Sequence, residues 1–150
     1  MLLPFPPPAQ GFVTGALMYW VARHLTLFPT SFAGQSQLSM VIIGTGLLIE
    51  LVAIWAFVQA KTTVNPIQPD RATELVTGGL YSISRNPMYL GLAILLTGWM
   101  LWLGDLANLL VLAGFIALIT VLQIKPEESV LQQKFGADYD AYRQKVRRWI

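Results

Sequence analysis

The hydrophobic positions of this chain fall into four long apolar runs that are separated by polar stretches. The runs cover approximately residues 10–28, 38–59, 87–103 and 106–124. An apolar run of roughly 20 residues is long enough to cross the hydrocarbon core of a bilayer as an α-helix. We therefore predict an all-α integral membrane protein, folded as one domain with four transmembrane helices.

Two polar segments stand outside this pattern. Residues 61–91 contain the polar connection between the second and third runs and the start of the third run. We expect this connection to form a re-entrant or surface loop. Residues 125–150 are charged and predict two short helices that are broken at Gly136. Tyr139 and Tyr142 begin an aromatic stripe among basic residues, so this amphipathic tail suits an anionic membrane surface. A solvated helix that packs its aromatic side chains on the loop is compatible with this interpretation.

The composition supports the membrane class and removes several kinds of chemistry. Hydrophobic residues make up 55% and charged residues 12%, against about 25% charged residues in soluble domains. Cysteine is absent, which excludes disulfides, thiolate metal sites and cysteine nucleophiles. A single histidine, His24, cannot form a metal cluster alone. We expect neither a metal ion nor a nucleic-acid partner.

The basic residues predict the orientation in the membrane. Of ten Lys and Arg residues, three lie in residues 61–86 and six lie in the tail, whereas residues 29–37 and 104–105 contain none. Cytoplasmic segments carry the excess of Lys and Arg. We therefore place residues 61–86 and both termini in the cytoplasm. The oligomeric state does not follow from the sequence.

Three polar residues lie within the predicted spans. Glu50 is near the middle of the second span, where an acid normally faces the protein interior. It is either a structural polar contact or a group that binds substrate or handles protons. Arg23 and His24 lie near the end of the first span and either snorkel to the headgroups or pair with Glu50. Gly44 and Gly46 indicate close helix packing.

The segment 73–91, TELVTGGLYSISRNPMYLG, carries more hydrogen-bonding groups than a simple connector needs. Gly78 and Gly79 permit backbone geometry that other residues resist, and Pro87 suits the first turn of the next helix. Loops on a rigid scaffold are where binding residues concentrate. We predict that this segment and residues 125–128, KPEE, form a cofactor pocket at a membrane surface.

Two motifs in these segments resemble a known family. LVTGGLYSISRNPMYLG, followed about 35 residues later by PEESVLQQKFGADYDAYRQKVRRWI, is similar to the isoprenylcysteine carboxyl methyltransferase family, which is related to the phospholipid (phosphatidylethanolamine) N-methyltransferases. The resemblance implies S-adenosylmethionine as the methyl donor, held between loop and tail without a Rossmann sheet. Residues 86–89 match the RHPxY box, with Asn86 in place of histidine, as in the NPMY of the phospholipid enzymes.

The resemblance also implies the site residues. The cofactor-binding set is Thr73, Glu74, Leu75, Val76, Tyr81, Asn86, Pro87, Met88, Tyr89, Glu127 and Glu128. The candidate catalytic residues are Arg85, Asn86 and Tyr89. Physically, Glu127 can accept hydrogen bonds from ribose hydroxyls, Tyr81 and Tyr89 can face a sulfonium, and Arg85 can pair with the cofactor carboxylate.

Each of these assignments has a structural alternative. Arg85 can anchor the third span at the headgroups. Tyr81 and Tyr89 can be interfacial aromatic residues only. Glu127 and Glu128 can favour the N-terminus of the tail helix through its dipole.

The candidate substrate residues are Glu50, Asn65 and Gln123. Gln123 stands where the isoprenylcysteine enzymes carry a substrate-binding arginine, which counts against a prenylcysteine acceptor. We expect a lipophilic small molecule or lipid, methylated on a carboxylate oxygen or an amine nitrogen, that enters laterally from the membrane. The alternatives are a proton-coupled exporter that uses Glu50, an NADPH-dependent reductase similar to the sterol reductases, and a non-catalytic scaffold.

Overall fold

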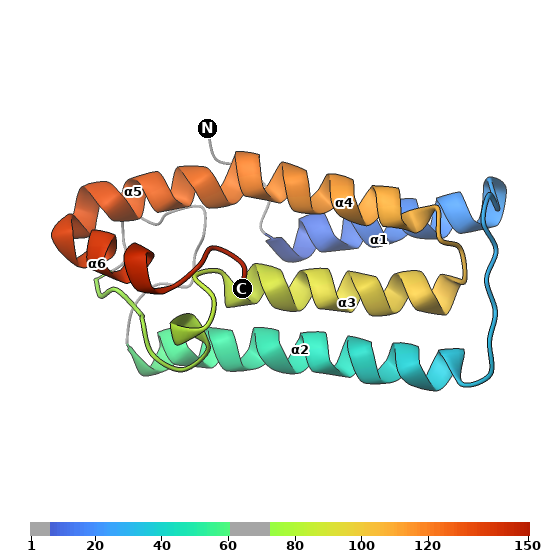
Figure 1. Cartoon of the computed structure of the whole chain (residues 1–150), viewed down its shortest axis with the longest axis horizontal. Coiled ribbons are helices and arrows are strands. Elements are labelled where there is room, and N and C mark those ends of the chain that lie inside the picture. Colours follow the sequence, from blue (N-terminus) through green and yellow to red (C-terminus); the bar gives the residue numbers. More distant parts are fainter. Residues whose placement is uncertain (1–6, 61–72) are drawn as a thin grey trace.

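The computed structural model describes residues 7–60 and 73–150, and within these ranges the chain is all-helical. The helices are α1 (Pro7–His24), α2 (Gln35–Gln59), α3 (Pro87–Leu103), α4 (Asn108–Ile119), α5 (Lys125–Phe135) and α6 (Ala137–Lys145). A 3₁₀ turn at Gly79–Ser82 precedes α3, and a π turn at Thr120–Ile124 joins α4 to α5 without a break. Figure 1 shows α1 to α4 as an up-and-down bundle.

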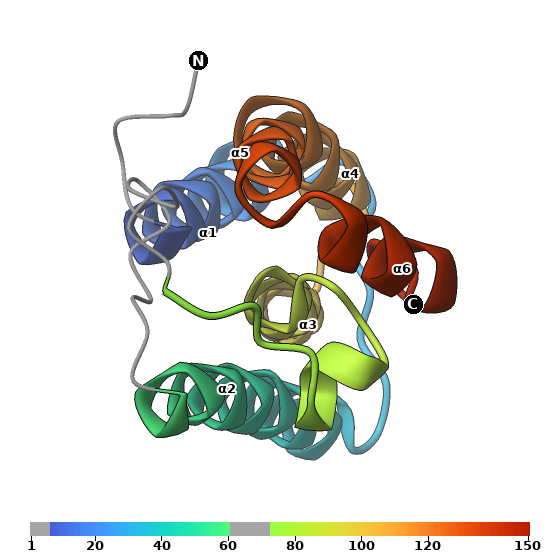
Figure 2. The same cartoon turned by 90° about the vertical axis from the view of Figure 1, so that its left-hand side faces the viewer.

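Helix α3 is the centre of the bundle, with α1, α2 and α4 around it (Figure 2). Its contact with α2 is made by small residues. A Cβ atom on Gly46 would lie 2.6 Å from the carbonyl oxygen of Gly91, and one on Gly98 would lie 2.8 Å from the backbone nitrogen of Ile43. The two backbones therefore touch. Gly44 has nothing within 4 Å, so only Gly46 of the predicted pair serves this packing.

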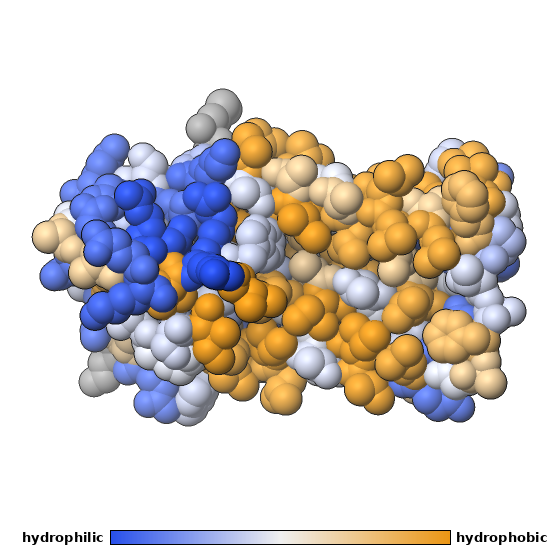
Figure 3. Space-filling view, in the orientation of Figure 1, coloured by the Kyte–Doolittle hydropathy of each residue, from blue (hydrophilic) through white to orange (hydrophobic). Residues whose placement is uncertain are grey.

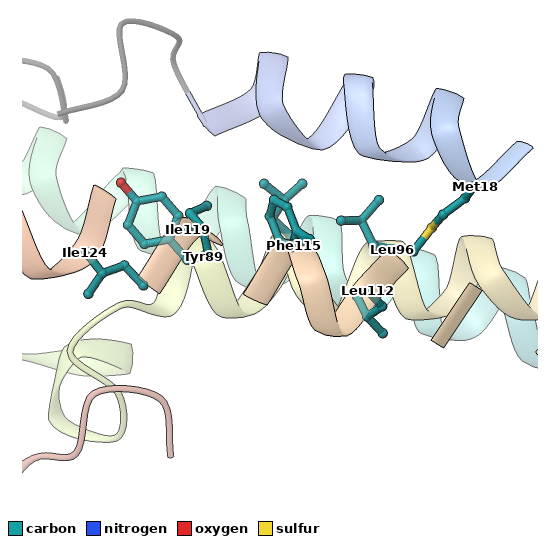
Figure 4. Packing of buried hydrophobic residues seen from close by; sticks show 8 residues of the cluster. Met18, Tyr89, Leu96, Leu112, Phe115, Ile119 and Ile124 are labelled. Atoms are coloured by element: carbon teal, nitrogen blue, oxygen red, sulfur yellow. The ribbon is translucent and has the colours of Figure 1, made fainter. Parts of the chain in front are cut away.

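The hydrophobic core runs along α3 between α1 and α4. Figure 4 shows its buried side chains stacked from Met18 and Leu96 to Tyr89 and Ile124. Leu96 and Ile119 are each 1% exposed. Because Tyr89 belongs to this core, the start of α3 is held firmly at the end where the polar segments gather.

The opposite end of the bundle is closed by Asp105. Its Oδ1 accepts hydrogen bonds from the backbone N–H of Phe28 at 3.1 Å and of Ala107 at 2.9 Å. These bonds correct two predicted boundaries. The first span does not reach residue 28, because α1 ends at His24 and Phe28 belongs to the loop. The fourth helix, α4, starts at Asn108 and not at residue 106, because Asp105 caps the turn before it.

The surface separates into an apolar body and a polar end. Figure 3 shows hydrophobic side chains over most of the bundle and hydrophilic ones gathered over α5 and α6. In the described residues, two helices are long and apolar enough to cross a membrane, Gln35–Gln59 and Asn108–Phe135, and Pro87–Leu103 is a shorter apolar helix. The apolar part of the helix Asn108–Phe135 ends at Ile124, and its charged part lies beyond.

Arg23 and His24 do not reach Glu50. The guanidinium of Arg23 lies over the ring of Tyr19, 5.7 Å from its centroid, and the ring of His24 stacks 5.3 Å from that of Trp20. Glu50 instead packs on Gly91 of α3. Of the two alternatives for Arg23 and His24, the pairing with Glu50 is therefore wrong, because α1 lies on the far side of α3 from α2 (Figure 2).

Candidate functional site

The two polar segments singled out in the sequence meet at one end of the bundle. The turn before α3 and the C-terminal helices lie side by side in both views (Figures 1 and 2). A parallel bridge between Ser84 and Arg147 joins them directly. Residues that are about 60 positions apart thus form one polar cluster at the edge of the apolar body.

Glu127 is the centre of the inner part of this cluster. Its Oε1 accepts a hydrogen bond from the hydroxyl of Tyr89 at 2.6 Å and another from Nε2 of Gln123 at 2.6 Å. Tyr89 lies on the first turn of α3, where Pro87 starts the helix. Gln123 is 0% exposed and precedes Glu127 by four residues on the same face of its helix. Two elements thus fix one oxygen of the carboxylate.

The environment of Glu127 favours its neutral form. Burial raises the pKa of this carboxyl to about 7, although the hydrogen bonds from Tyr89 and Gln123 act against the rise. The adjacent Glu128 adds to it. A carboxyl that titrates near neutral pH and lies beside a buried tyrosine is typical of functional sites.

Glu128 faces the other way and forms an ion-pair cluster. Its Oε1 accepts a hydrogen bond from Nη2 of Arg85 at 2.8 Å, and its Oε2 accepts one from Nη2 of Arg148 at 2.7 Å. The side chains of Arg85 and Glu128 are only 8% and 13% exposed. Burial opposes ionisation of Glu128, but the hydrogen bonds and charges of Arg148 and Arg85 outweigh it and lower the pKa of this carboxyl.

The last residues of the chain are bound along the turn before α3. The backbone N–H of Arg85 donates to the carbonyl of Arg147 at 3.0 Å, and Nδ2 of Asn86 donates to the carbonyl of Arg148 at 3.0 Å. Nη1 of Arg85 also donates to the carbonyl of Val146 at 2.9 Å. The C-terminus therefore forms part of the cluster.

The aromatic stripe of α6 packs against the loop. Tyr139, Tyr142 and Val146 are buried and pack with Leu75 of the loop. The hydroxyl of Tyr142 donates to the carbonyl of Tyr81 at 2.7 Å. The expected packing of these aromatic side chains on the loop is therefore confirmed, and the binding of the basic residues of the tail to a membrane surface stays a prediction. The sequence pattern of α6 did not indicate which residues its aromatic side chains contact, and the structure shows that Leu75 of the loop is one of them.

Tyr81 lies at the base of the loop, close to the same cluster. It is 6% exposed, and its ring packs edge-on against Phe57 of α2 with centroids 5.3 Å apart. Burial raises the pKa of its phenol, and the nearby Tyr142 and Glu127 add to the rise. Because Tyr81 and Tyr89 are both buried, the interpretation of these residues as interfacial aromatics only is wrong.

Two other structural alternatives also fail. Arg85 does not anchor α3 at the headgroups, because its guanidinium is buried and paired with Glu128. Glu127 and Glu128 do not mark a helix N-terminus, because the helix runs on without interruption from Asn108 to Phe135.

The remaining predicted site residues differ in their exposure and in their place in the fold. Thr73 and Glu74 are exposed, and Val76 and Met88 are half-buried. Glu50 packs at the α2–α3 contact and forms no part of the hydrogen-bonded cluster. Asn65 lies outside the described residues.

Sequence reasoning missed Arg148, Ser84 and Tyr142 as parts of the cluster. Arg148 lies in a run of basic residues, so the sequence gives no signal that this one pairs with an acid. The contact between Gln123 and Glu127 could have been found, since their spacing of four places them on one helix face.

The apolar bundle (Figure 3) with a buried polar cluster at one end is typical of a helical, membrane-associated protein, and the cluster is the candidate site. The sequence model of the phospholipid methyltransferase family matches residues 35–138, more than half of the chain. The chain therefore belongs to this family and is a methyltransferase.

Two of the relatives that the chain matches are named as methyltransferases. The chain is 33% identical over 142 residues to a probable protein-S-isoprenylcysteine O-methyltransferase of Oryza sativa subsp. indica, covering 87% of this chain and 71% of the relative. It is 32% identical to protein-S-isoprenylcysteine O-methyltransferase of Schizosaccharomyces pombe, over 61% of this chain and 40% of the relative. It is also 48% identical to an uncharacterized protein of Haemophilus influenzae, over 42% of this chain and all of the relative. No solved structure matches the chain significantly.

Proposed function

We propose that this protein transfers a methyl group from S-adenosylmethionine to a lipophilic small-molecule or lipid acceptor at the cytoplasmic face of a membrane. The observation that carries the proposal is the contact between Tyr89 and Glu127. It brings together the two motifs on which the family resemblance rests, and it does so at the end of the bundle where a water-soluble donor meets apolar helices.

The residues of the cluster fit the donor. Glu127 uses Oε1 for Tyr89 and Gln123, and Oε2 accepts no hydrogen bond from residues 7–60 or 73–150. That oxygen is available to ribose hydroxyls. Nε of Arg85 is buried without a partner in the same described ranges, so one donor remains for the cofactor carboxylate. The rings of Tyr81 and Tyr89 supply faces for a cation.

The chemistry requires positioning more than acid–base catalysis. When bound, the donor supplies an electrophilic methyl group on a sulfonium. The protein aligns the nucleophile with that methyl group and excludes water, and these two effects supply most of the rate. Tyr89 and Glu127 are the residues that hold this alignment, because they join α3 to α5 at the buried end of the cluster.

Glu128 and Arg148 have a different role in this proposal. Both are used in the ion-pair cluster, so we assign them to holding the C-terminus over the site and not to direct binding of the cofactor. Asn86, bonded to the carbonyl of Arg148, joins in this closure.

The acceptor enters from the membrane side. We place four helices across the bilayer, with the polar end of α5 and α6 in the cytoplasm, since six of the ten basic residues lie in the tail. Helix α3 has 17 residues, about 26 Å at 1.5 Å per residue, so its first turn, with Tyr89, lies near the membrane surface. Gln123 is uncharged and stands where the isoprenylcysteine enzymes carry a substrate-binding arginine. We therefore expect an acceptor whose binding does not require an arginine.

A labelling experiment tests the proposal. Membranes that contain the wild type, Glu127→Ala or Asp138→Ala are incubated with methyl-labelled S-adenosylmethionine, and the lipid extract is analysed by mass spectrometry. We expect a labelled product with the wild type and with Asp138→Ala, an exposed acid outside the cluster, and none with Glu127→Ala. Labelling that is equal in all three, or absent with a folded wild type, would contradict the proposal.

A further inference from the structure

The helix that carries Glu127 is not a regular α-helix. It runs from Asn108 to Phe135 and contains a π turn at Thr120–Ile124. The backbone N–H of Lys125 donates to the carbonyl of Thr120, five residues back, instead of four. The turn ends three residues before Glu127. Single π turns inside α-helices occur frequently at functional sites.

The sequence supplies a cause for this turn. Pro126 lies inside the continuous helix, where it has no N–H to donate. The proline ring also conflicts with the carbonyl four residues earlier, which here belongs to Leu122. Widening the preceding turn relieves this conflict, and bulges and prolines are recognised causes of local helix distortion. Pro126 thus accounts for the position of the π turn.

The π turn changes the direction in which Glu127 points. Glu127 follows Ile119 by eight residues, and each residue of an α-helix advances about 100° around the axis. A regular helix would therefore rotate Glu127 by about 80° from the side of Ile119, which is buried in the core. The π turn takes up one extra residue, which removes roughly one rotation of about 100°. Glu127 then lies within about 20° of the side of Ile119.

Without the π turn, a different residue would face α3. In a regular helix Pro126, seven residues after Ile119, would take the place near Tyr89. Glu127 would turn away, and its 2.6 Å hydrogen bond with Tyr89 would be lost.

We propose that Pro126 is a positioning residue: it maintains the π turn that directs Glu127 toward Tyr89. The importance of this direction for methyl transfer rests on the proposed function, whereas the direction itself is a property of the fold. Replacement by alanine, Pro126→Ala, allows the helix to become regular and to rotate Glu127 away. Deletion of the exposed Val121 from that variant removes the extra residue, so a regular helix again directs Glu127 toward α3.

Crosslinking measures this direction without any cofactor. The chain contains no cysteine, so the pair Tyr89→Cys and Glu127→Cys can be tested with a short thiol-reactive crosslinker. We expect efficient crosslinking with Pro126 present, little in Pro126→Ala, and recovery when Val121 is also deleted. The control pair, Leu96→Cys and Leu112→Cys, lies on the same helices before the turn (Figure 4) and should crosslink in every background.

Binding of S-adenosylmethionine provides a second measurement, made with Tyr89 and Glu127 intact. Pro126→Ala should weaken it by roughly tenfold or more, and deletion of Val121 should restore it. Undiminished crosslinking of the 89–127 pair in Pro126→Ala would overturn the proposal. So would a double variant whose control pair crosslinks but whose 89–127 pair does not. A wild type that crosslinks as expected but binds no S-adenosylmethionine would instead reject the proposed function.

Discussion

Tyr89 of α3 donates a 2.6 Å hydrogen bond to Glu127 of α5, although 38 positions separate the two residues in the sequence. The bond joins the start of the third helix to the charged continuation of the fourth. It is buried, since Tyr89 is only 5% exposed. The same contact couples a motif that precedes an apolar helix to a motif that follows one, and we propose that the donor binds beside it.

Removal of one hydroxyl tests the importance of this bond. Tyr89→Phe keeps the ring in the core but takes a donor from Glu127. Hydrogen bonds to charged groups contribute about 1.5–3 kcal/mol, so we expect the affinity for S-adenosylmethionine to fall by roughly tenfold or more. The matched control is Tyr19→Phe, at a tyrosine outside the cluster. Unchanged binding in calorimetric titrations of Tyr89→Phe would show that the bond is structural only.

The protonation of Glu127 predicts a pH dependence. Its pKa is raised to about 7, mainly by burial, so lowering the pH through 7 converts the carboxylate to the neutral acid. The neutral acid is a poorer acceptor for ribose hydroxyls, and the affinity of the wild type should fall as the pH drops from 8 to 6. Glu127→Gln should bind weakly and without this pH dependence. A wild-type affinity that is flat over this range would contradict the role of the carboxylate.

The ion-pair cluster predicts unequal effects of removing its members. Glu128→Gln leaves the buried guanidinium of Arg85 without its counter-charge, which costs on the order of 3–5 kcal/mol. Arg148→Ala should destabilise less, because Arg148 is more exposed and Arg85 still neutralises Glu128. Thermal unfolding measures both, and limited proteolysis of the C-terminus should show faster cleavage in each. Arg147→Ala, at an exposed side chain, serves as the control.

If Glu128→Gln and Arg147→Ala had the same melting temperature, the cluster would not be what holds the tail in place.

The glycines of α2 provide a matched test of the bundle. A Cβ atom on Gly46 would lie 2.6 Å from backbone atoms of α3, so Gly46→Ala must push the two helices apart. Such overpacking costs typically about 1–3 kcal/mol. Gly44→Ala meets nothing within 4 Å and should be neutral or stabilising, since alanine favours helix. Equal stability of the two variants in thermal unfolding would contradict the described α2–α3 contact.

Much of the fold follows from apolar periodicity. The predicted third span, 87–103, coincides with α3 because Pro87 and Gly104 mark its ends unambiguously. The end of the first helix was predicted four residues too late. Leu25, Leu27 and Phe28 are apolar, but Thr26 has a positive φ and a distant partner, Asp105, binds the backbone of Phe28, so these residues form a loop. Hydrophobicity indicates which residues avoid water. It does not indicate whether those residues belong to the helix or to the loop that follows it.

The candidate site shows the same limit. Motif resemblance placed Tyr89 and Glu127 in one pocket, and the structure brings them into contact. The ion pair of Arg85 with Glu128, and the part of Arg148 in it, depends on tertiary contacts between segments with no periodic relation. The π turn was not predicted either, although Pro126 within a helix is its visible sign in the sequence.

Titration of S-adenosylmethionine into the purified protein, in a lipid nanodisc at pH 8, tests the central claim most directly. We predict saturable binding of one donor by the wild type and by Asp138→Ala. Glu127→Ala should fold normally but bind the donor at least about 100-fold more weakly. A folded wild type that binds no donor, or a Glu127→Ala variant that binds as tightly as the wild type, would contradict the claim.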